Sequence, residues 1–209
     1  MRCRMGEDGR RFLTRRTGLI LLAGAALSGA NATFEDPRRA EDPFSGRSWE
    51  HVADIGNGYG HGATLGLGAL AMLAAGGLSG DRNLRAAGWD ASRALGYTFV
   101  IVAGLKATVH RTRPDGGRYS FPSGHVAGAF AMAPVLSRHF GLRAALPAYA
   151  LALATTVGRL EDRKHYLSDA VFGAAIGTSV GLAVSRSDEV ACGVRLSFAP
   201  GRAGVSVGF

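Results

Sequence analysis

The chain has 209 residues, of which 47% are hydrophobic, and its formal net charge is +8. This length is sufficient for one domain with a hydrophobic core. The basic residues form no continuous stripe and are not interleaved with aromatic residues, which argues against a nucleic-acid-binding surface. The two cysteines, Cys3 and Cys192, are too few for a disulfide framework or a thiolate metal site.

Residues 1–32 have the pattern of an export signal. A basic leader ends at Arg15 and Arg16, an apolar run follows over 18–27, and small residues close it at Ala30–Ala32. The apolar run is short for a membrane span, and the small residues predict a cleavage site. The pattern leaves the Sec and twin-arginine routes open. The alternative is a short N-terminal anchor helix that stays attached.

Residues 33–50 are charged and contain two prolines, so they predict an extended arm. The main domain is expected over 51–190, and the Gly- and Ala-rich composition of its apolar segments favours an all-α helical bundle. Polar joints separate five predicted helices, which are 62–79, 91–109, 124–139, 143–158 and 168–185.

Residues 191–209 alternate apolar with small or polar residues around a Pro-Gly turn, which predicts a small C-terminal β-hairpin packed against the helices. With the leader, the chain has six apolar segments, so a six-span membrane protein competes with a soluble or peripheral bundle. The third and fourth predicted helices have only 16 residues each by these boundaries, fewer than the roughly 20 that cross a bilayer. This argument favours the soluble or peripheral form.

Lys106 lies in the middle of an apolar run, where an ammonium group needs an anionic partner. Arg113 follows two helical turns later, on the same face, and Pro114 marks the end of the helix. Two cations at one helix end can be a phosphate cradle or a pair of surface charges. The surface interpretation suits Arg113 better than Lys106.

The second cluster is the sequence PSGH, in which Ser123 is an expected N-cap for a helix that starts at Gly124 and carries His125. Free backbone N–H groups at a helix N-terminus attract anions. Taken alone, the cluster is equally compatible with a capped helix and with a catalytic histidine.

The third cluster contains Arg159, His165 and Asp169. His165 and Asp169 are spaced i, i+4, so on a helix the carboxylate can reach the imidazole and fix its tautomer. This is the arrangement of an activated nucleophile with an orienting group. Taken alone, such a pair is weak evidence for a site.

Together, the three clusters resemble the three-part signature of the type 2 phosphatidic acid phosphatase (PAP2) superfamily, which includes bacterial acid phosphatases, lipid phosphatases and vanadium haloperoxidases. The matching residues run from Lys106 to Asp169. One departure is Gly158, which stands where the family usually has a serine before the motif arginine. We expect Gly158 to change local hydrogen bonding without abolishing activity.

The resemblance implies a helical bundle of the acid phosphatase and haloperoxidase type, and a division of roles that suits phosphoryl transfer. His165, oriented by Asp169, would attack phosphorus to give a phosphohistidine, and His125 would protonate the leaving oxygen. The phosphate-binding groups would be Lys106, Arg113, Ser123, Gly124 and Arg159. With three cations on the phosphate, no metal or other cofactor is required.

The expected function is a metal-independent phosphatase that acts on phosphomonoesters or on lipid phosphates and diphosphates. The expected location is the periplasm or cell envelope, or alternatively the inner membrane with the site facing the periplasm. The partner is a phosphate-containing small molecule or lipid. Two other functions stay open: a vanadate-dependent haloperoxidase, and a non-enzymatic anion-binding protein of the envelope.

Four further polar residues could shape the substrate entrance, although a structural role is expected for each. They are His51, Asp54, His61 and His110.

Overall fold

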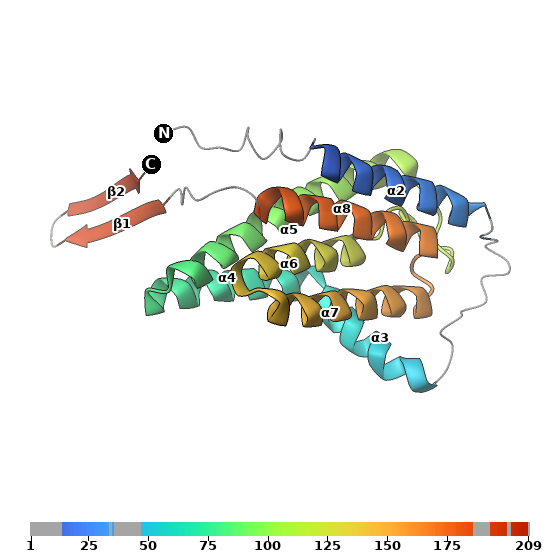
Figure 1. The fold of residues 1–209 in the computed structure, drawn as a ribbon, viewed down its shortest axis with the longest axis horizontal. Coiled ribbons are helices and arrows are strands. Elements are labelled where there is room, and N and C mark those ends of the chain that lie inside the picture. The colour runs from blue at the N-terminus through green and yellow to red at the C-terminus, as the bar shows by residue number, and fades with distance from the viewer. Residues whose placement is uncertain (1–13, 34, 36–46, 186–192, 200–201, 209) are drawn as a thin grey trace.

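The computed structural model describes residues 14–33, 35, 47–185, 193–199 and 202–208 (Figure 1). Its helices are α2 (Arg15–Ala32), α3 (Arg47–Gly60), α4 (Gly62–Ser79), α5 (Arg82–Val109), α6 (Gly124–Phe140), α7 (Leu142–Glu161) and α8 (Leu167–Ser185). The predicted all-α bundle is confirmed.

Helix α6 forms the centre of the bundle and packs against α5, α7 and α8 (Figure 1). It is rich in alanine, and its buried residues include Ala127, Ala131 and Val135. Small side chains allow helix axes to approach closely, which explains how one helix can have three neighbours. The core then extends outward to larger side chains such as Leu95 on α5 and Ile176 on α8.

The bounds of α4 agree with the prediction, whereas α5 begins nine residues earlier than predicted. The segment before residue 91 looks like a polar joint, but Asp81 caps a helix there. Its carboxylate accepts hydrogen bonds from the backbone N–H groups of Asn83 and Leu84, at 2.9 and 3.0 Å. A side-chain cap of this kind satisfies N–H groups that have no partner within the helix.

Helix α3 was not predicted, and its first residues fall in the segment expected to be extended. It lies against α7, where a Cβ atom at Gly56 would come within 2.1 Å of the carbonyl oxygen of Ala154. Thr155 of α7 also donates a hydrogen bond to the Gly56 carbonyl, at 2.9 Å. Tertiary packing therefore forms this helix in a glycine-rich segment of low helix propensity.

The length argument applies to α6 and α7, which have 17 and 20 residues, so α7 reaches the roughly 20 that cross a bilayer and α6 does not. Among the described residues, the helices long and apolar enough to cross a membrane are α4 and α8. The predicted signal segment is also a helix of the bundle: α2 packs along α8 (Figure 1). Whether residues 1–32 are removed stays a prediction.

At the C-terminal end, β1 (Gly193–Ala199) pairs antiparallel with β2 (Arg202–Gly208), with Val194 opposite Val207. The predicted Pro-Gly turn lies outside the described residues, and so does the linker from α8.

The three sequence clusters meet at one end of the bundle, which we call the site end. Helices α5 and α7 finish there, and α6 and α8 begin there (Figure 1). The alternating direction of consecutive helices thus brings together residues that are up to 63 positions apart in the chain, from Lys106 to Asp169.

Candidate active site

His165 and Asp169 lie side by side at the start of α8. The Nδ1 atom of His165 is 3.7 Å from Oδ2 of Asp169, and the side chains are 4% and 0% exposed. This distance is too long for a hydrogen bond, although it is short enough for strong electrostatic interaction. Because Nδ1 faces the carboxylate, Nε2 on the other side of the ring is the nitrogen directed away from Asp169.

Burial lowers the pKa of His165 below the ordinary histidine value. The neighbouring Asp169 carboxylate acts in the opposite direction and raises this pKa, whereas the positive charge of Lys106 adds to the lowering. The balance favours a neutral imidazole, which is the form that has a lone pair for attack.

The cations of the first motif lie around this histidine. Lys106 reaches from the last turn of α5 to the loop before α6, where its Nζ donates to the carbonyl oxygens of Tyr119 and Ser120, at 2.5 and 3.4 Å. Arg113 lies within electrostatic range of both Lys106 and His165. Its Nε is buried and has no hydrogen-bond partner in the described part of the chain.

Ser123 occupies the N-cap position of α6, but its side chain does not cap the helix. Its hydroxyl is buried and without a hydrogen-bond partner among the described residues, while its backbone N–H donates to the Asp169 carbonyl at 3.1 Å. The predicted N-cap position is therefore confirmed, but its hydroxyl does not bond to the helix and remains available to a ligand. Gly124 begins α6, so its N–H also lacks a partner within the helix.

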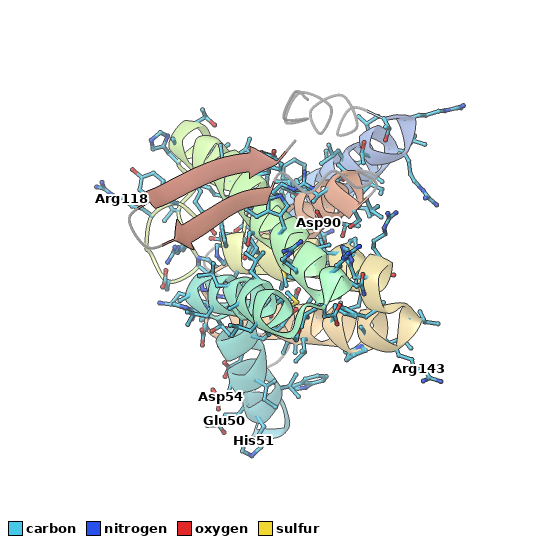
Figure 2. All side chains as sticks on the ribbon, turned by 90° about the vertical axis from the view of Figure 1, so that its left-hand side faces the viewer. Glu50, His51, Asp54, Asp90, Arg118 and Arg143 are labelled. Carbon is cyan, nitrogen blue, oxygen red and sulfur yellow. The ribbon has the colours of Figure 1, made fainter. Side chains whose placement is uncertain are left out.

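His125 follows in the first turn of α6, half-buried between the other clusters. Arg159, His165 and Lys106 are all within electrostatic range of it, and so is His61, whose ring centroid is 5.8 Å away. His61 therefore lies closer to the site than its expected structural role implied. In contrast, His51 and Asp54 are exposed on α3 and point away from the bundle (Figure 2).

Arg159 is held by α3, which the sequence did not predict. Its Nη1 donates to Oδ1 of Asn57 at 2.9 Å and lies 3.2 Å from Oδ2 of Asp162. Gly158 makes this contact possible, since a Cβ atom there would lie 2.7 Å from Oδ1 of Asn57 and 2.7 Å from the Ala53 carbonyl oxygen. The departure from the usual serine is thus linked to the close approach of α3 and to Asn57.

Sequence reasoning also missed the groups that hold Asp169. Arg111 donates from Nη1 to Oδ1 of Asp169 at 2.7 Å. On the other oxygen, the Ser120 hydroxyl and the Tyr166 backbone N–H both donate to Oδ2. Arg111 stands two residues before Arg113 of the first motif, so the second arginine in that loop could have indicated a role at the site. No feature of the sequence indicated a role for Ser120.

The character of the site is that of an anion-binding site. The positive charges of Lys106 and Arg159 lie within electrostatic range of His125, and those of Lys106 and Arg113 lie within range of His165. Buried donors of Arg113, Ser123 and Arg159 have no hydrogen-bond partner among the residues that the structure describes. Within the described residues, no three His, Cys, Asp or Glu side chains are grouped as a metal site would need. Such a donor set suits a phosphate group.

Comparison with known proteins agrees with this chemistry. The PAP2 superfamily profile matches residues 115–190. The chain is 38% identical over 96 residues to a lipid A 1-phosphatase of Porphyromonas gingivalis, covering 43% of this chain and 22% of that protein. It is 31% identical over 88 residues to a lipid A 4'-phosphatase of Helicobacter pylori, covering 36% of this chain and 44% of that protein. The chain thus spans less than half the length of these relatives.

The fold resembles that of a transmembrane PAP2-type phosphatidylglycerolphosphate phosphatase from Bacillus subtilis, with a TM-score of 0.57 and 20% identity over 86% of this chain and 94% of that one. The profile match contains the second and third motifs, whereas the first motif precedes it. The resemblance inferred from the motifs is confirmed: the chain carries a PAP2 superfamily segment at residues 115–190, within an all-α fold found in a transmembrane protein of that type.

Proposed function

We propose that this protein is a membrane-embedded phosphatase that hydrolyses lipid phosphates through a phosphohistidine. The observation that carries the proposal is the set of buried donors that have no hydrogen-bond partner within the described ranges of the chain, contributed by all three motifs: Arg113 Nε, Ser123 Oγ and Arg159 Nε. Buried polar groups are almost always hydrogen-bonded, so orphaned donors in one place imply a ligand that accepts from them. A phosphate has the charge and the number of oxygens to do so.

In the first step, Nε2 of His165 attacks phosphorus as a P–N bond forms and the bond to the leaving oxygen breaks. Lys106, Arg113 and Arg159 neutralise the negative charge on the equatorial oxygens. The positive charge that develops on the His165 ring is stabilised by Asp169, 3.7 Å from its Nδ1. Because the carboxylate is fully buried, this stabilisation acts in a low dielectric.

His125 handles the proton. It donates a proton to the leaving oxygen in the first step, and it takes one from the attacking water in the second. Water then breaks the P–N bond and releases inorganic phosphate, which returns both histidines to their initial states. The negative charge of the bound phosphate favours the protonated form of His125, which is otherwise surrounded by cations.

Support for a lipid substrate comes from the lateral surface of the bundle. Large apolar side chains are exposed on α2, α4, α5 and α7, including Leu22 at 68%, Leu67 at 67%, Val100 at 73% and Leu146 at 62%. So many exposed large apolar side chains are unusual for a water-soluble domain and suit contact with lipid. Val109 and Leu167 extend the exposed apolar surface to the site end. A lipid chain in the bilayer would therefore lie beside the phosphate site.

The arginines at the opposite end of the bundle support an orientation. Arg15 and Arg16 begin α2, Arg82 begins α5, and Arg138 and Arg143 flank the junction of α6 and α7. Basic residues at the start of the first helix favour the cytoplasmic side, and the first helix usually sets the orientation of the chain. The connections at the site end are also basic, with Arg118, Arg163 and Lys164, so the orientation rests on Arg15 and Arg16. The site end would then face the exported side, which in a Gram-negative envelope is the periplasm.

The first experiment measures phosphate release from phosphatidic acid, an isoprenyl diphosphate, a lipid A phosphate and p-nitrophenyl phosphate, in mixed micelles with and without EDTA. Turnover of at least one lipid phosphate, preferred over the soluble ester and insensitive to EDTA, is expected. His165→Ala should remove this turnover. His51→Ala, an exposed histidine that points away from the bundle (Figure 2), is the control and should retain it.

Orientation is tested by labelling intact cells with a membrane-impermeant maleimide, with Cys3 and Cys192 replaced by serine. Arg118→Cys near the site and Arg143→Cys at the start of α7 are both exposed (Figure 2). Labelling of Arg118→Cys alone is expected before lysis, and of both after it. Labelling of Arg143→Cys alone in intact cells would reverse the orientation.

A further inference from the structure

Glu35 lies next to the active site, although it precedes the first motif by 71 residues and belongs to the segment predicted to be an extended arm. Its Oε2 accepts a hydrogen bond from Nη2 of Arg111 at 2.9 Å. Arg111 in turn donates to Oδ1 of Asp169 at 2.7 Å. One guanidinium therefore bridges two carboxylates, of which only Asp169 is adjacent to the nucleophile.

Glu35 also holds the start of α8. Its Oε1 accepts from the backbone N–H of Ser168 at 2.8 Å, and Oε2 accepts from the Ser168 hydroxyl at 2.5 Å. The Ser168 N–H is in the first turn of α8 and has no partner within the helix, so Glu35 caps this helix from a distant part of the chain. The residue that follows Ser168 is Asp169.

The guanidinium of Arg111 is fixed on its remaining sides. Its Nη1 also donates to the Ser168 hydroxyl at 2.6 Å, and its Cζ lies 4.1 Å from the ring centroid of Tyr166. Burial alone would lower the pKa of Arg111, but the hydrogen bonds and charges of Glu35 and Asp169 raise it above the ordinary value. Arg111 therefore stays charged and shared between the two carboxylates.

Glu35 reaches this place because of α2, the helix that immediately precedes it. Thr17 and Ser28 of α2 are buried, and the Ser28 hydroxyl donates to the Ser168 carbonyl at 2.9 Å. Gly24 lies so close to α8 that a Cβ atom there would be 2.3 Å from Cβ of Ala175. The segment predicted to leave as a signal peptide thus delivers Glu35 to the first turn of α8.

We propose that Glu35 is a positioning residue for the phosphatase reaction, and that residues 15–35 remain part of the active enzyme. This proposal rests on the proposed function. Glu35 shares the charge of Arg111, so that Asp169 keeps enough negative charge to stabilise the His165 imidazolium, and it fixes the helix turn that carries Asp169.

The test compares Glu35→Gln, Glu35→Asp and the control Glu50→Gln, an exposed carboxylate on α3 (Figure 2), in full-length protein purified in detergent. Glu35→Gln keeps the shape but removes the charge, so kcat should fall about 10-fold, the size of a charge-assisted hydrogen bond, with little change in KM. Because a negative charge is lost, the acid limb of the pH profile should move to lower pH. Glu35→Asp should recover part of kcat, and Glu50→Gln should equal wild type.

A merely structural role would lower the yield or Tm of Glu35→Gln without moving the acid limb. Wild-type kcat and pH profile in Glu35→Gln would therefore overturn the proposal, and so would a loss of stability with an unmoved profile. If the wild-type enzyme hydrolyses no substrate of the panel, the proposed function is contradicted, and the role of Glu35 in the reaction is contradicted with it.

Mass spectrometry of the intact purified protein tests independently whether α2 is retained. A mass that includes residues 15–32 is expected. A mature protein that begins after Ala32 and is fully active would overturn the second half of the proposal, whatever the substrate is.

Discussion

Helices α4 and α8 are equally apolar but have opposite surroundings. Both have an 18-residue window of mean hydropathy 1.5, yet 17% of that window is buried in α4 and 67% in α8. Helix α8 carries a buried carboxylate, Asp169, in its first turn, which needs hydrogen-bond donors from several elements. Helix α4 carries no such group, and most of its side chains are exposed. Mean hydropathy therefore does not distinguish an interior helix from an exposed one. The distinguishing feature here is the buried carboxylate of α8, whose hydrogen-bond donors come from several elements.

The largest expected effect is on catalysis, from the buried carboxylate of α8. Asp169→Asn keeps the shape of the side chain but removes the charge that faces His165, so kcat should fall about 10,000-fold, as when the orienting carboxylate of a catalytic triad is replaced. Asp54→Asn, on the exposed face of α3, is the matched control. Phosphate release from the preferred lipid measures both. An Asp169→Asn enzyme within 10-fold of wild type would show that the reaction does not need the charge of Asp169.

Glycine substitutions should separate the helices by stability. A Cβ atom at Gly177 of α8 would lie 2.0 Å from the carbonyl oxygen of Ala127 in α6, whereas at Gly68 of α4 it would meet nothing within 4 Å. We expect Gly177→Ala to destabilise the fold by about 3 kcal/mol, or roughly 10 °C in Tm. Gly68→Ala should be neutral or slightly stabilising. Thermal unfolding in detergent measures both, and equal Tm values would contradict the close packing of α8.

Labelling should show which helix contacts lipid. Leu70 of α4 is 59% exposed and Ile176 of α8 is 1% exposed. In a background without native cysteines, a bimane on Leu70→Cys should be quenched by about half or more with nitroxide-labelled lipids, because the label lies in the bilayer. Ile176→Cys should react with the label only after unfolding in SDS. Efficient quenching by a water-soluble quencher at position 70, with none by lipid, would contradict the membrane assignment.

The smallest expected effect is on pH dependence. Burial lowers the pKa of His165, and the neutral form is the nucleophile, so activity is lost only when the pH falls through this lowered value. The acid limb of kcat/KM should therefore lie below about 6.5, the ordinary histidine pKa. His51→Ala should leave the limb in place. An acid limb at or above the ordinary histidine pKa would contradict the burial of His165 at the start of α8.

The sequence predicted those features that depend on local pattern. The bounds of α4 and the meeting of Lys106, His125 and His165 at one end follow from apolar periodicity and from three spaced motifs. Helix α3 could not be predicted from propensity, because its glycines form a helix only against α7. Glu35 had no local signal, since its contacts with Ser168 span 133 residues.

The C-terminal end of α7 was misplaced for a physical reason. The sequence pattern ended this helix at residue 158, whereas it continues to Glu161. Its last turn carries Arg159, whose Nη1 donates to Oδ1 of Asn57 in α3. A charged side chain that contacts a neighbouring helix therefore extends α7 beyond its apolar run.

The central claim, that His165 is the nucleophile, is tested most directly by trapping the phosphoenzyme. Wild type and His51→Ala are mixed with ³²P-labelled lipid phosphate, quenched within milliseconds in alkali and analysed by peptide mapping. We predict an alkali-stable, acid-labile label on the peptide that contains His165, and no label in His165→Ala. Label on another residue, or an equally labelled His165→Ala enzyme, would contradict the account.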